Sequence, residues 1–227
     1  VRRMGLDYRY RYTGQGEIDR LLVSDRANGR TLLVSFDYDN LGRETRRAYH
    51  LNGEIKSRYE QTWSVSGQLL TKSWFRNGES EARRSETFAY ETHRNELKQW
   101  SVRAFKGYEI QDNNQKGIQD QAYTYDALGN LLTCVTTFLD GASERREFLY
   151  GNASQPTQRT GITVTHTPNG GKAGKPITHT LVSDKNGSLA TDGSDHQFVY
   201  TPVGQLQSVT SVKDRTLLAS YEYDHIG

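Results

Sequence analysis

The sequence repeats one short turn motif along nearly its whole length. Its three strongest copies are Tyr38-Asp39-Asn40-Leu41-Gly42, Tyr125-Asp126-Ala127-Leu128-Gly129 and Tyr223-Asp224-His225-Ile226-Gly227. Four weaker copies run from Tyr12 to Gly16, from Trp63 to Gly67, from Ser183 and Asp184 to Gly187, and from Tyr200 to Gly204. A repeat this regular constrains the fold more than composition does, because every copy must form the same local structure.

The residues of the motif predict a type I turn. Each copy has Asp, Ser or Thr at the first position of a four-residue turn and Gly at the fourth. The short polar side chain accepts a hydrogen bond from the backbone two residues on, and Gly adopts a positive φ that strains other residues. We therefore interpret the repeated aspartates, Asp39, Asp126, Asp184 and Asp224, as structural turn residues.

A second turn signal alternates with the first. The pairs Asn28-Gly29, Asn52-Gly53, Asn77-Gly78 and Asp140-Gly141 predict tight hairpins. Aromatic residues spaced by two, such as Phe36 and Tyr38, precede the first kind of turn and predict strand ends with both rings on one face. One turn of each kind occurs in roughly every 25 residues, which predicts an all-β fold built as a long antiparallel meander of hairpins.

Composition agrees with a sheet that lacks a thick core. Hydrophobic residues make up 34% of the chain, and each predicted strand has only about three large residues on its apolar face. The 29 basic and 27 acidic side chains leave a net charge of +2, which argues against binding of nucleic acid or of an anionic membrane surface. The sequence also contains no apolar run of the roughly 18 residues that a membrane-spanning helix needs.

Two stretches interrupt the rhythm, at about residues 93–121 and about 151–180. Both are rich in turn-forming residues and predict irregular insertions. The repeats resume beyond each of them, so residues 1–227 are expected to form a single array. The ends of the sequence fall within the repeat pattern, and we interpret the chain as a fragment of a larger protein.

The Tyr-Asp-x-x-Gly turns, their spacing and the aromatic pairs resemble those of Rhs/YD-repeat proteins. The resemblance spans nearly the whole chain. Residues 36–44 and 121–132 are most similar to the Rhs-repeat subunits of bacterial insecticidal toxin complexes and of related polymorphic toxins.

This resemblance implies a sheet that curls into part of a hollow β-shell, which encapsulates a toxic effector formed by the C-terminal part of the same protein. It implies a secreted or exported bacterial protein. The implied partners are the remainder of the Rhs shell, the enclosed toxin polypeptide, and other toxin-complex or secretion-system subunits. The segment that seals such shells and the family's protease residues have no match in this sequence.

The sequence offers few candidates for chemistry. No common catalytic, nucleotide-binding or calcium-loop motif occurs, so we expect no enzyme activity, cofactor or metal site. The repeated aspartates are too sparse to supply the six to eight oxygens of a calcium site. Asp192, Asp195 and His196 could form an acid–base group, although the same residues also predict a turn.

Two alternatives to a shell segment follow from the residues. An extracellular module that binds glycans or a receptor would use exposed rings, with Trp63, Trp74 and Trp100 as the contacts. An enzyme would have its site near residues 192–196. The Arg pairs 46–47, 83–84 and 145–146 are expected to form cross-strand ion pairs with nearby Glu residues, and Cys134 is expected to be a small buried apolar residue.

Overall fold

The computed structural model describes residues 2–3 and 5–224, and these contain strands and turns but no helix. The strands are β1 (Arg2–Arg3), β2 (Leu6–Tyr12), β3 (Ile18–Asp25), β4 (Arg30–Tyr38), β5 (Glu44–Leu51), β6 (Glu54–Trp63), β7 (Leu69–Arg76), β8 (Arg84–Tyr90), β9 (Leu97–Ala104), β10 (Ile118–Tyr125), β11 (Leu131–Phe138), β12 (Ser143–Leu149), β13 (Gly161–Thr167), β14 (Ile177–Thr180), β15 (Val182–Ser183), β16 (Leu189–Thr191), β17 (His196–Tyr200), β18 (Leu206–Ser211) and β19 (Leu217–Ser220). The all-β class is therefore confirmed. None of these residues belongs to a helix long and apolar enough to cross a membrane.

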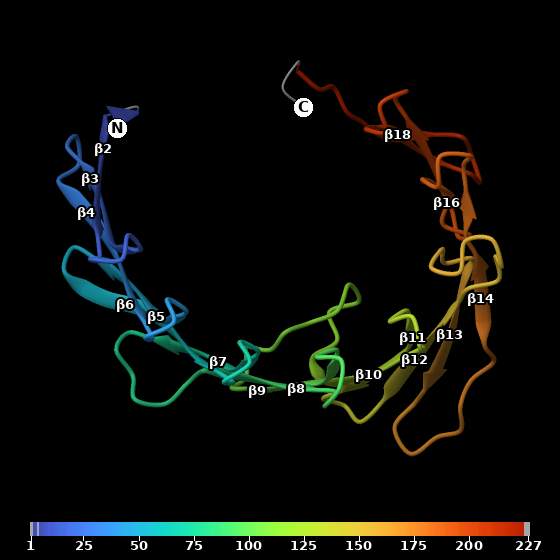
Figure 1. Ribbon diagram of the computed structural model, residues 1–227, viewed down its shortest axis with the longest axis horizontal. Helices are drawn as coiled ribbons and strands as arrows, with labels where there is room; N and C mark the ends of the chain where they lie inside the picture. Colours follow the sequence, from blue (N-terminus) through green and yellow to red (C-terminus); the bar gives the residue numbers. More distant parts are fainter. Residues whose placement is uncertain (1, 4, 225–227) are drawn as a thin grey trace. The chain divides into compact units, whose positions relative to one another are not determined.

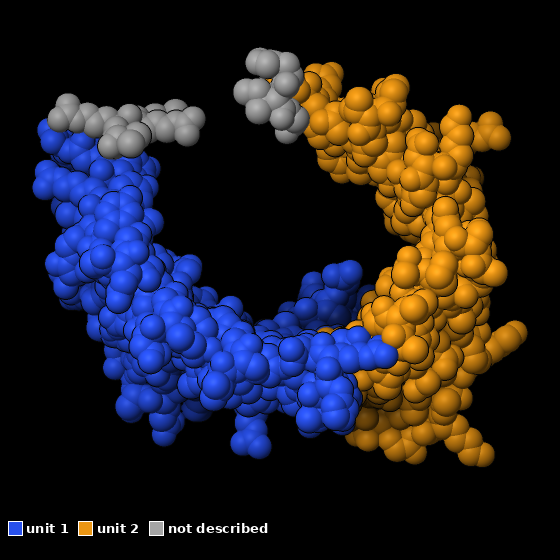
Figure 2. Space-filling view, in the orientation of Figure 1, with its two compact units in different colours: residues 1–121 blue, residues 122–227 orange. Residues whose placement is uncertain are grey.

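The chain divides into two compact units, residues 1–121 and residues 122–227, and the boundary lies within β10 (Figure 2). In the first unit, each strand from β1 to β8 pairs antiparallel with the next one along the chain. Figure 1 shows these strands following one another along a curved path. The predicted antiparallel meander is thus confirmed.

The second unit continues the same pattern in two sheets. One contains β11 to β14 and the other contains β15 to β19, with antiparallel neighbours throughout. A single residue, Leu181, separates the last strand of the first sheet from the first strand of the second. Its backbone N–H donates to the Thr160 carbonyl at 2.9 Å, so the chain passes from one sheet to the other without a turn.

Little of this chain is buried. The buried apolar residues are few and are spread over both units: Val34, Ala48, Phe75, Val102, Ile118, Cys134, Phe138 and Ala142. The chain exposes 15329 Å², whereas a compact monomer of this mass exposes about 10,500 Å². A sheet without a covering layer explains why an apolar share of 34% is sufficient.

Because the strands form a meander, the turns of each unit alternate between two edges of the sheet, which here means the two borders where the strands end and not the outermost strands. We call the edge that carries the Tyr-Asp-x-x-Gly motifs the Asp-turn edge, and the opposite edge the Asn-Gly edge. On the Asn-Gly edge, Asn52 and Gly53 have φ values of 52° and 86°, and Asn77 and Gly78 have 48° and 72°. Two consecutive positive values define a type I′ hairpin, which fits the right-handed twist of the strands.

The predicted insertions are shorter than the sequence suggested. β9 lies inside the stretch 93–121, and β13 and β14 lie inside the stretch 151–180. The irregular segments are therefore residues 105–117, 150–160 and 168–176. The sequence did not predict β9 because the turn before it contains no glycine. In this turn the Glu91 N–H donates to the Glu96 carbonyl at 2.8 Å.

Candidate functional surfaces

The turns on the Asp-turn edge share one hydrogen-bond pattern. In the copy at Asp39, the Gly42 N–H donates to the Asp39 carbonyl at 3.1 Å, and the Asp39 N–H donates to the Arg43 carbonyl at 2.9 Å. The Asp39 carboxylate accepts the N–H groups of Leu41 and Arg43 at 2.9 and 3.0 Å. The side chain therefore satisfies two backbone donors that the turn leaves without strand partners.

The same two backbone bonds recur in every copy that the structure describes in full. The first residues of these six turns are Thr13, Asp39, Ser64, Asp126, Asp184 and Thr201, and their fourth residues are Gly16, Gly42, Gly67, Gly129, Gly187 and Gly204. All six glycines have positive φ. In the last copy, Tyr223 and Asp224 are described, whereas Gly227 lies outside the described residues.

Aromatic residues at this edge connect successive turns. The Tyr38 hydroxyl, at the end of β4, donates to the Ile18 carbonyl, at the start of β3, at 2.7 Å. Trp63 donates through Nε1 to the Glu44 carbonyl at 2.8 Å. The other three bonds join Tyr90 to Leu69 at 3.0 Å, Tyr150 to Leu131 at 3.1 Å and Tyr223 to Leu206 at 2.8 Å.

These five bonds follow one rule, and we call them the aromatic stitches. The acceptor is always the carbonyl five residues after the first residue of the preceding turn, as Ile18 is to Thr13 and Glu44 is to Asp39. Each stitch thus joins the aromatic residue of one repeat to the turn of the repeat before it. Tyr125 ends β10 and Tyr200 ends β17, at a β-bulge, in the equivalent position.

The two faces of the first unit carry different side chains. Residues opposite one another in the strand pairing share a face. Some positions are connected through the pairing of neighbouring strands, and others lie two residues apart along one strand; both kinds share a face. One face, the aromatic face, contains Phe36, Tyr49, Tyr59, Trp74, Phe88 and Trp100. The other, the hydroxyl face, contains Thr62, Thr71, Ser73, Ser85, Thr87 and Ser101.

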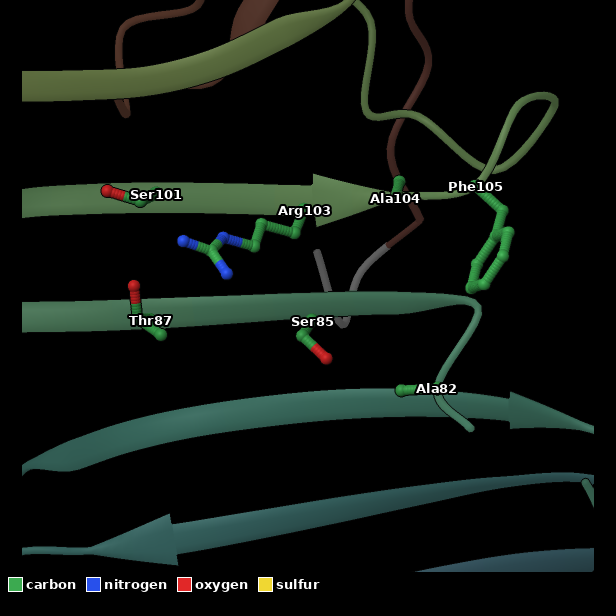
Figure 3. Close-up of a pocket in the computed structure, with 7 residues that line it drawn as sticks. All are labelled: Ala82, Ser85, Thr87, Ser101, Arg103, Ala104 and Phe105. Atoms are coloured by element: carbon green, nitrogen blue, oxygen red, sulfur yellow. The ribbon is translucent and has the colours of Figure 1, made fainter. Parts of the chain in front are cut away.

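A hollow of about 650 Å³ lies on the hydroxyl face (Figure 3). Ser85, Thr87 and Ser101 line it, Arg103 lies across it and Phe105 stands at one end. The floor is the sheet itself, where Ser85 faces Arg103 and Thr87 faces Ser101 in the pairing of β8 with β9. Arg103 is exposed, so this hollow offers one exposed cation beside small hydroxyl groups.

A second hollow of about 600 Å³ lies on the aromatic face. It is lined by Arg43, Glu44, Arg47, Tyr49, Tyr59, Gln61, Trp63 and Lys72, and every one of these side chains is half-buried. Glu44 holds two of the lining residues in place. Its carboxylate accepts a hydrogen bond from Arg47 Nη2 at 2.6 Å, and its backbone carbonyl accepts the hydrogen bond from Trp63 Nε1. Of the three tryptophans expected as glycan contacts, only Trp63 lines this hollow, since Trp74 packs on Tyr108 at 5.3 Å and Trp100 binds Glu86 at 3.2 Å.

The predicted acid–base group is present in part. His196 Nδ1 lies 2.6 Å from Asp192 Oδ2. Burial opposes ionisation of Asp192, but hydrogen bonds from His196 and from the Ser194 backbone outweigh it and hold the pKa of this carboxyl well below its ordinary value. Asp195 lies apart from this pair and accepts the Ser211 hydroxyl at 3.1 Å. The Ser211 hydroxyl is thus bound by Asp195 and not by the imidazole.

The remaining candidates for chemistry are the Arg pairs, which form ion pairs, and Cys134, which is buried. Four of the six paired arginines bind the predicted Glu residues, but along one strand: Arg47 binds Glu44 at 2.6 Å, Arg84 binds Glu86 at 3.3 Å, Arg145 binds Glu147 at 3.0 Å and Arg146 binds Glu144 at 2.7 Å. The cross-strand expectation was wrong for Arg84, Arg145 and Arg146 because residues i and i+2 lie side by side on one face. Arg46 does form a cross-strand ion pair, but with Asp37 at 3.1 Å, and Arg83 binds Glu79 in the preceding turn. Cys134 is buried, and burial raises the pKa of its thiol. Within residues 2–3 and 5–224, no cluster of three potential metal ligands occurs.

Comparison with known proteins shows a likeness in fold. No family model and no curated protein matches the sequence. The chain superposes on part of the crystal structure of TcdB2-TccC3 without hypervariable C-terminal region with a TM-score of 0.61 and 16% identity, over 93% of this chain and 12% of that chain. A second structure, TcdB2-TccC3, gives a TM-score of 0.48 and 14% identity, over 89% of this chain and 12% of that chain. The fold expected from the Rhs-repeat resemblance is therefore confirmed.

Proposed function

We propose that this chain is a structural, non-catalytic segment of a bacterial toxin shell, and that the shell encloses a toxic polypeptide formed by the C-terminal part of the same protein. The observation that carries the proposal is the uncovered, stitched antiparallel sheet. Its likeness in fold to TcdB2-TccC3, a protein with a hypervariable C-terminal region, supports it. Enclosure requires a wide, continuous wall and no catalytic group in this chain.

The stitched meander suits such a wall for two reasons. Each repeat contacts only its neighbours, so the sheet can extend by adding repeats without needing a larger core. Each stitch fixes the spacing of successive turns on one edge, so curvature accumulates regularly from repeat to repeat. A sheet that closes on itself also removes the exposed strand edges that would otherwise pair with other chains.

The proposal assigns partners and a location. The first partner is the remainder of the same shell, and the second is the enclosed toxin polypeptide. Other toxin-complex or secretion-system subunits would deliver the particle, so the protein would be exported from the bacterium. The Asp192–His196 pair would stabilise the turn between β16 and β17, because Asp192 also accepts the Ser194 and His196 backbone N–H groups at 2.9 and 3.1 Å.

Limited proteolysis of the complete natural protein tests enclosure. We expect its C-terminal polypeptide to resist protease in the native particle and to be digested after unfolding. The double variant Tyr38→Phe with Tyr90→Phe removes two stitches and should accelerate digestion. The matched control is Tyr10→Phe with Tyr221→Phe, since these side chains are 47% and 45% exposed and each lies two residues before the aromatic residue of a turn motif.

Two results would contradict the proposal. One is digestion of the C-terminal polypeptide at the same rate in the native and unfolded protein. The other is an open ribbon, and not a closed particle, in electron micrographs of the complete protein.

A further inference from the structure

We propose that the hollow on the aromatic face binds a saccharide unit that carries a carboxylate. This inference goes beyond enclosure and does not depend on it. The hollow lies over β5, β6 and β7, within the first unit, and its volume of about 600 Å³ falls in the range of small-ligand sites. The proposal depends on three properties of its lining: charge, rigidity and the kind of groups that remain available.

The charge of the hollow favours an anion. Three cations, Arg43, Arg47 and Lys72, line it together with one carboxylate, Glu44. Arg43 is paired with Asp39 at 2.7 Å and Arg47 with Glu44 at 2.6 Å, so these two cations are already neutralised. Lys72 is the cation that remains.

Lys72 has no carboxylate within 4.0 Å among the described residues. Glu86 lies opposite it in the pairing of β7 with β8, but Glu86 is bound by Arg84 at 3.3 Å and by Trp100 at 3.2 Å. The Lys72 ammonium instead lies 5.3 Å from the centre of the Tyr59 ring, which holds it at the hollow. A carboxylate entering the hollow would therefore find an unpaired and positioned cation.

The lining is held in place before any ligand arrives. Gln61 donates to both the carbonyl and the carboxylate of Glu44, at 3.2 and 3.3 Å. Arg43 donates to the Ser64 carbonyl at 2.6 Å and lies 5.9 Å from the centre of the Trp63 ring. A network held in this way loses little conformational entropy when it binds a ligand.

The available groups suit a sugar ring better than an acidic peptide. Sugar hydroxyls both donate and accept, and the hollow presents acceptor oxygens of Glu44 and Gln61 together with the Lys72 ammonium donor. Tyr49, Tyr59 and Trp63 supply aromatic surface, on which the C–H groups of a sugar can pack. An extended acidic peptide would need unpaired backbone groups along the rim, and β5 to β7 are paired on both sides.

Calorimetric titration of the purified protein tests the site. The probes are tetragalacturonate and 3′-sialyllactose, with lactose as the neutral control and a short poly-glutamate peptide as the acidic control. We expect at least one acidic saccharide to bind, lactose not to bind, and added salt to weaken binding. The stronger of the two acidic saccharides identifies the source of the carboxylate, a hexuronate or a sialic acid.

Lys72→Met should weaken binding by about tenfold or more, because it removes the charge and keeps an apolar contact with the Tyr59 ring. The matched control is Lys98→Met, which removes a lysine whose partner is Glu91, at 3.4 Å, outside the hollow. If Lys72→Met fails to fold, Tyr59→Leu provides the second test and should also weaken binding.

Three results would overturn the site: no binding of either acidic saccharide, equal binding by wild type and the lining variants, or equal binding of the poly-glutamate peptide. Each of them would leave enclosure unaffected, because enclosure is tested by proteolysis of the C-terminal polypeptide.

Discussion

The two edges of the sheet carry connections of very different regularity. On the Asp-turn edge, six described turns repeat the same pair of backbone hydrogen bonds. On the Asn-Gly edge, the connections range from two residues at Asn52-Gly53 to the segment 105–117. The difference lies in the length of the connections: one edge mostly repeats a turn of one length, whereas the other accommodates connections of different lengths.

The stitches explain this difference. An insertion into an Asp turn would move the acceptor carbonyl of the next stitch, so it would disturb two repeats at once. Two connections on this edge depart from the pattern, residues 91–96 and the long segment 150–160, and both follow the same logic. Tyr90 and Tyr150 still donate to the Leu69 and Leu131 carbonyls at 3.0 and 3.1 Å, so each connection departs from the pattern only after the stitch is made.

The largest expected effect comes from a substitution on the Asn-Gly edge. It tests whether every connection on that edge tolerates a change. Gly193 lies on that edge, between β16 and β17, and an added Cβ would clash with the Thr180 carbonyl oxygen and lie 2.5 Å from the Thr180 nitrogen. Backbone atoms cannot move aside as a side chain can. We expect Gly193→Ala to lower the free energy of unfolding by about 3 kcal/mol or more, measured by urea denaturation.

The control for Gly193 is Gly204 on the Asp-turn edge. Gly204 has φ +84°, but a Cβ built there meets no atom within 4 Å. Gly204→Ala should therefore cost only the left-handed backbone strain, about 1–2 kcal/mol. Equal losses for the two variants would show that strain, and not the contact with Thr180, limits the Asn-Gly edge.

A smaller effect is expected from a single stitch. Tyr38→Phe keeps the ring and removes the hydroxyl that donates to the Ile18 carbonyl. The loss of one partly buried hydrogen bond should lower the free energy of unfolding by about 1 kcal/mol, measured by urea denaturation. Tyr12→Phe, at a side chain that is 57% exposed, should change it by less than about 0.5 kcal/mol. Equal free energies of unfolding for the two variants would mean that the stitches set the spacing of the turns but do not contribute to stability.

The sequence predicts the fold well because its turns depend on glycine. Gly42, Gly129 and Gly187 need a positive φ, and that need is visible in the sequence. One further turn is not visible. Residues 112–116 form the same turn, with the Gln115 N–H donating to the Asp112 carbonyl at 3.0 Å and with Gln115 at φ 61°.

The surfaces are less predictable, for a different reason. The spacing of Tyr38, Tyr90 and Tyr150 is visible in the sequence, but the atoms that accept their hydrogen bonds are backbone carbonyls, which leave no sequence signal. The hollow on the aromatic face combines residues of β5, β6 and β7. Their juxtaposition depends on register shifts, such as the β-bulges at Tyr38 and Trp63, that alternation alone does not reveal.

The smallest expected effect would sharpen the comparison of the edges through pH. The side-chain hydrogen bond from Arg43 lowers the pKa of Asp39. Its stabilisation is therefore present above the unfolded pKa, about 3.9, and is lost as the pH falls through the lower folded value. Asp39→Asn keeps an acceptor oxygen but cannot titrate, so urea denaturation at a series of pH values should show a shallower loss of stability below about pH 4. On the Asn-Gly edge, the side-chain hydrogen bond from Asn28 lowers the pKa of Asp25. This donor is neutral, and hydrogen bonds from neutral donors are weaker than those from charged ones, so Asp25→Asn should flatten the acid limb less than Asp39→Asn. A larger flattening from Asp25→Asn would contradict the assignment of the charged turn to the Asp-turn edge.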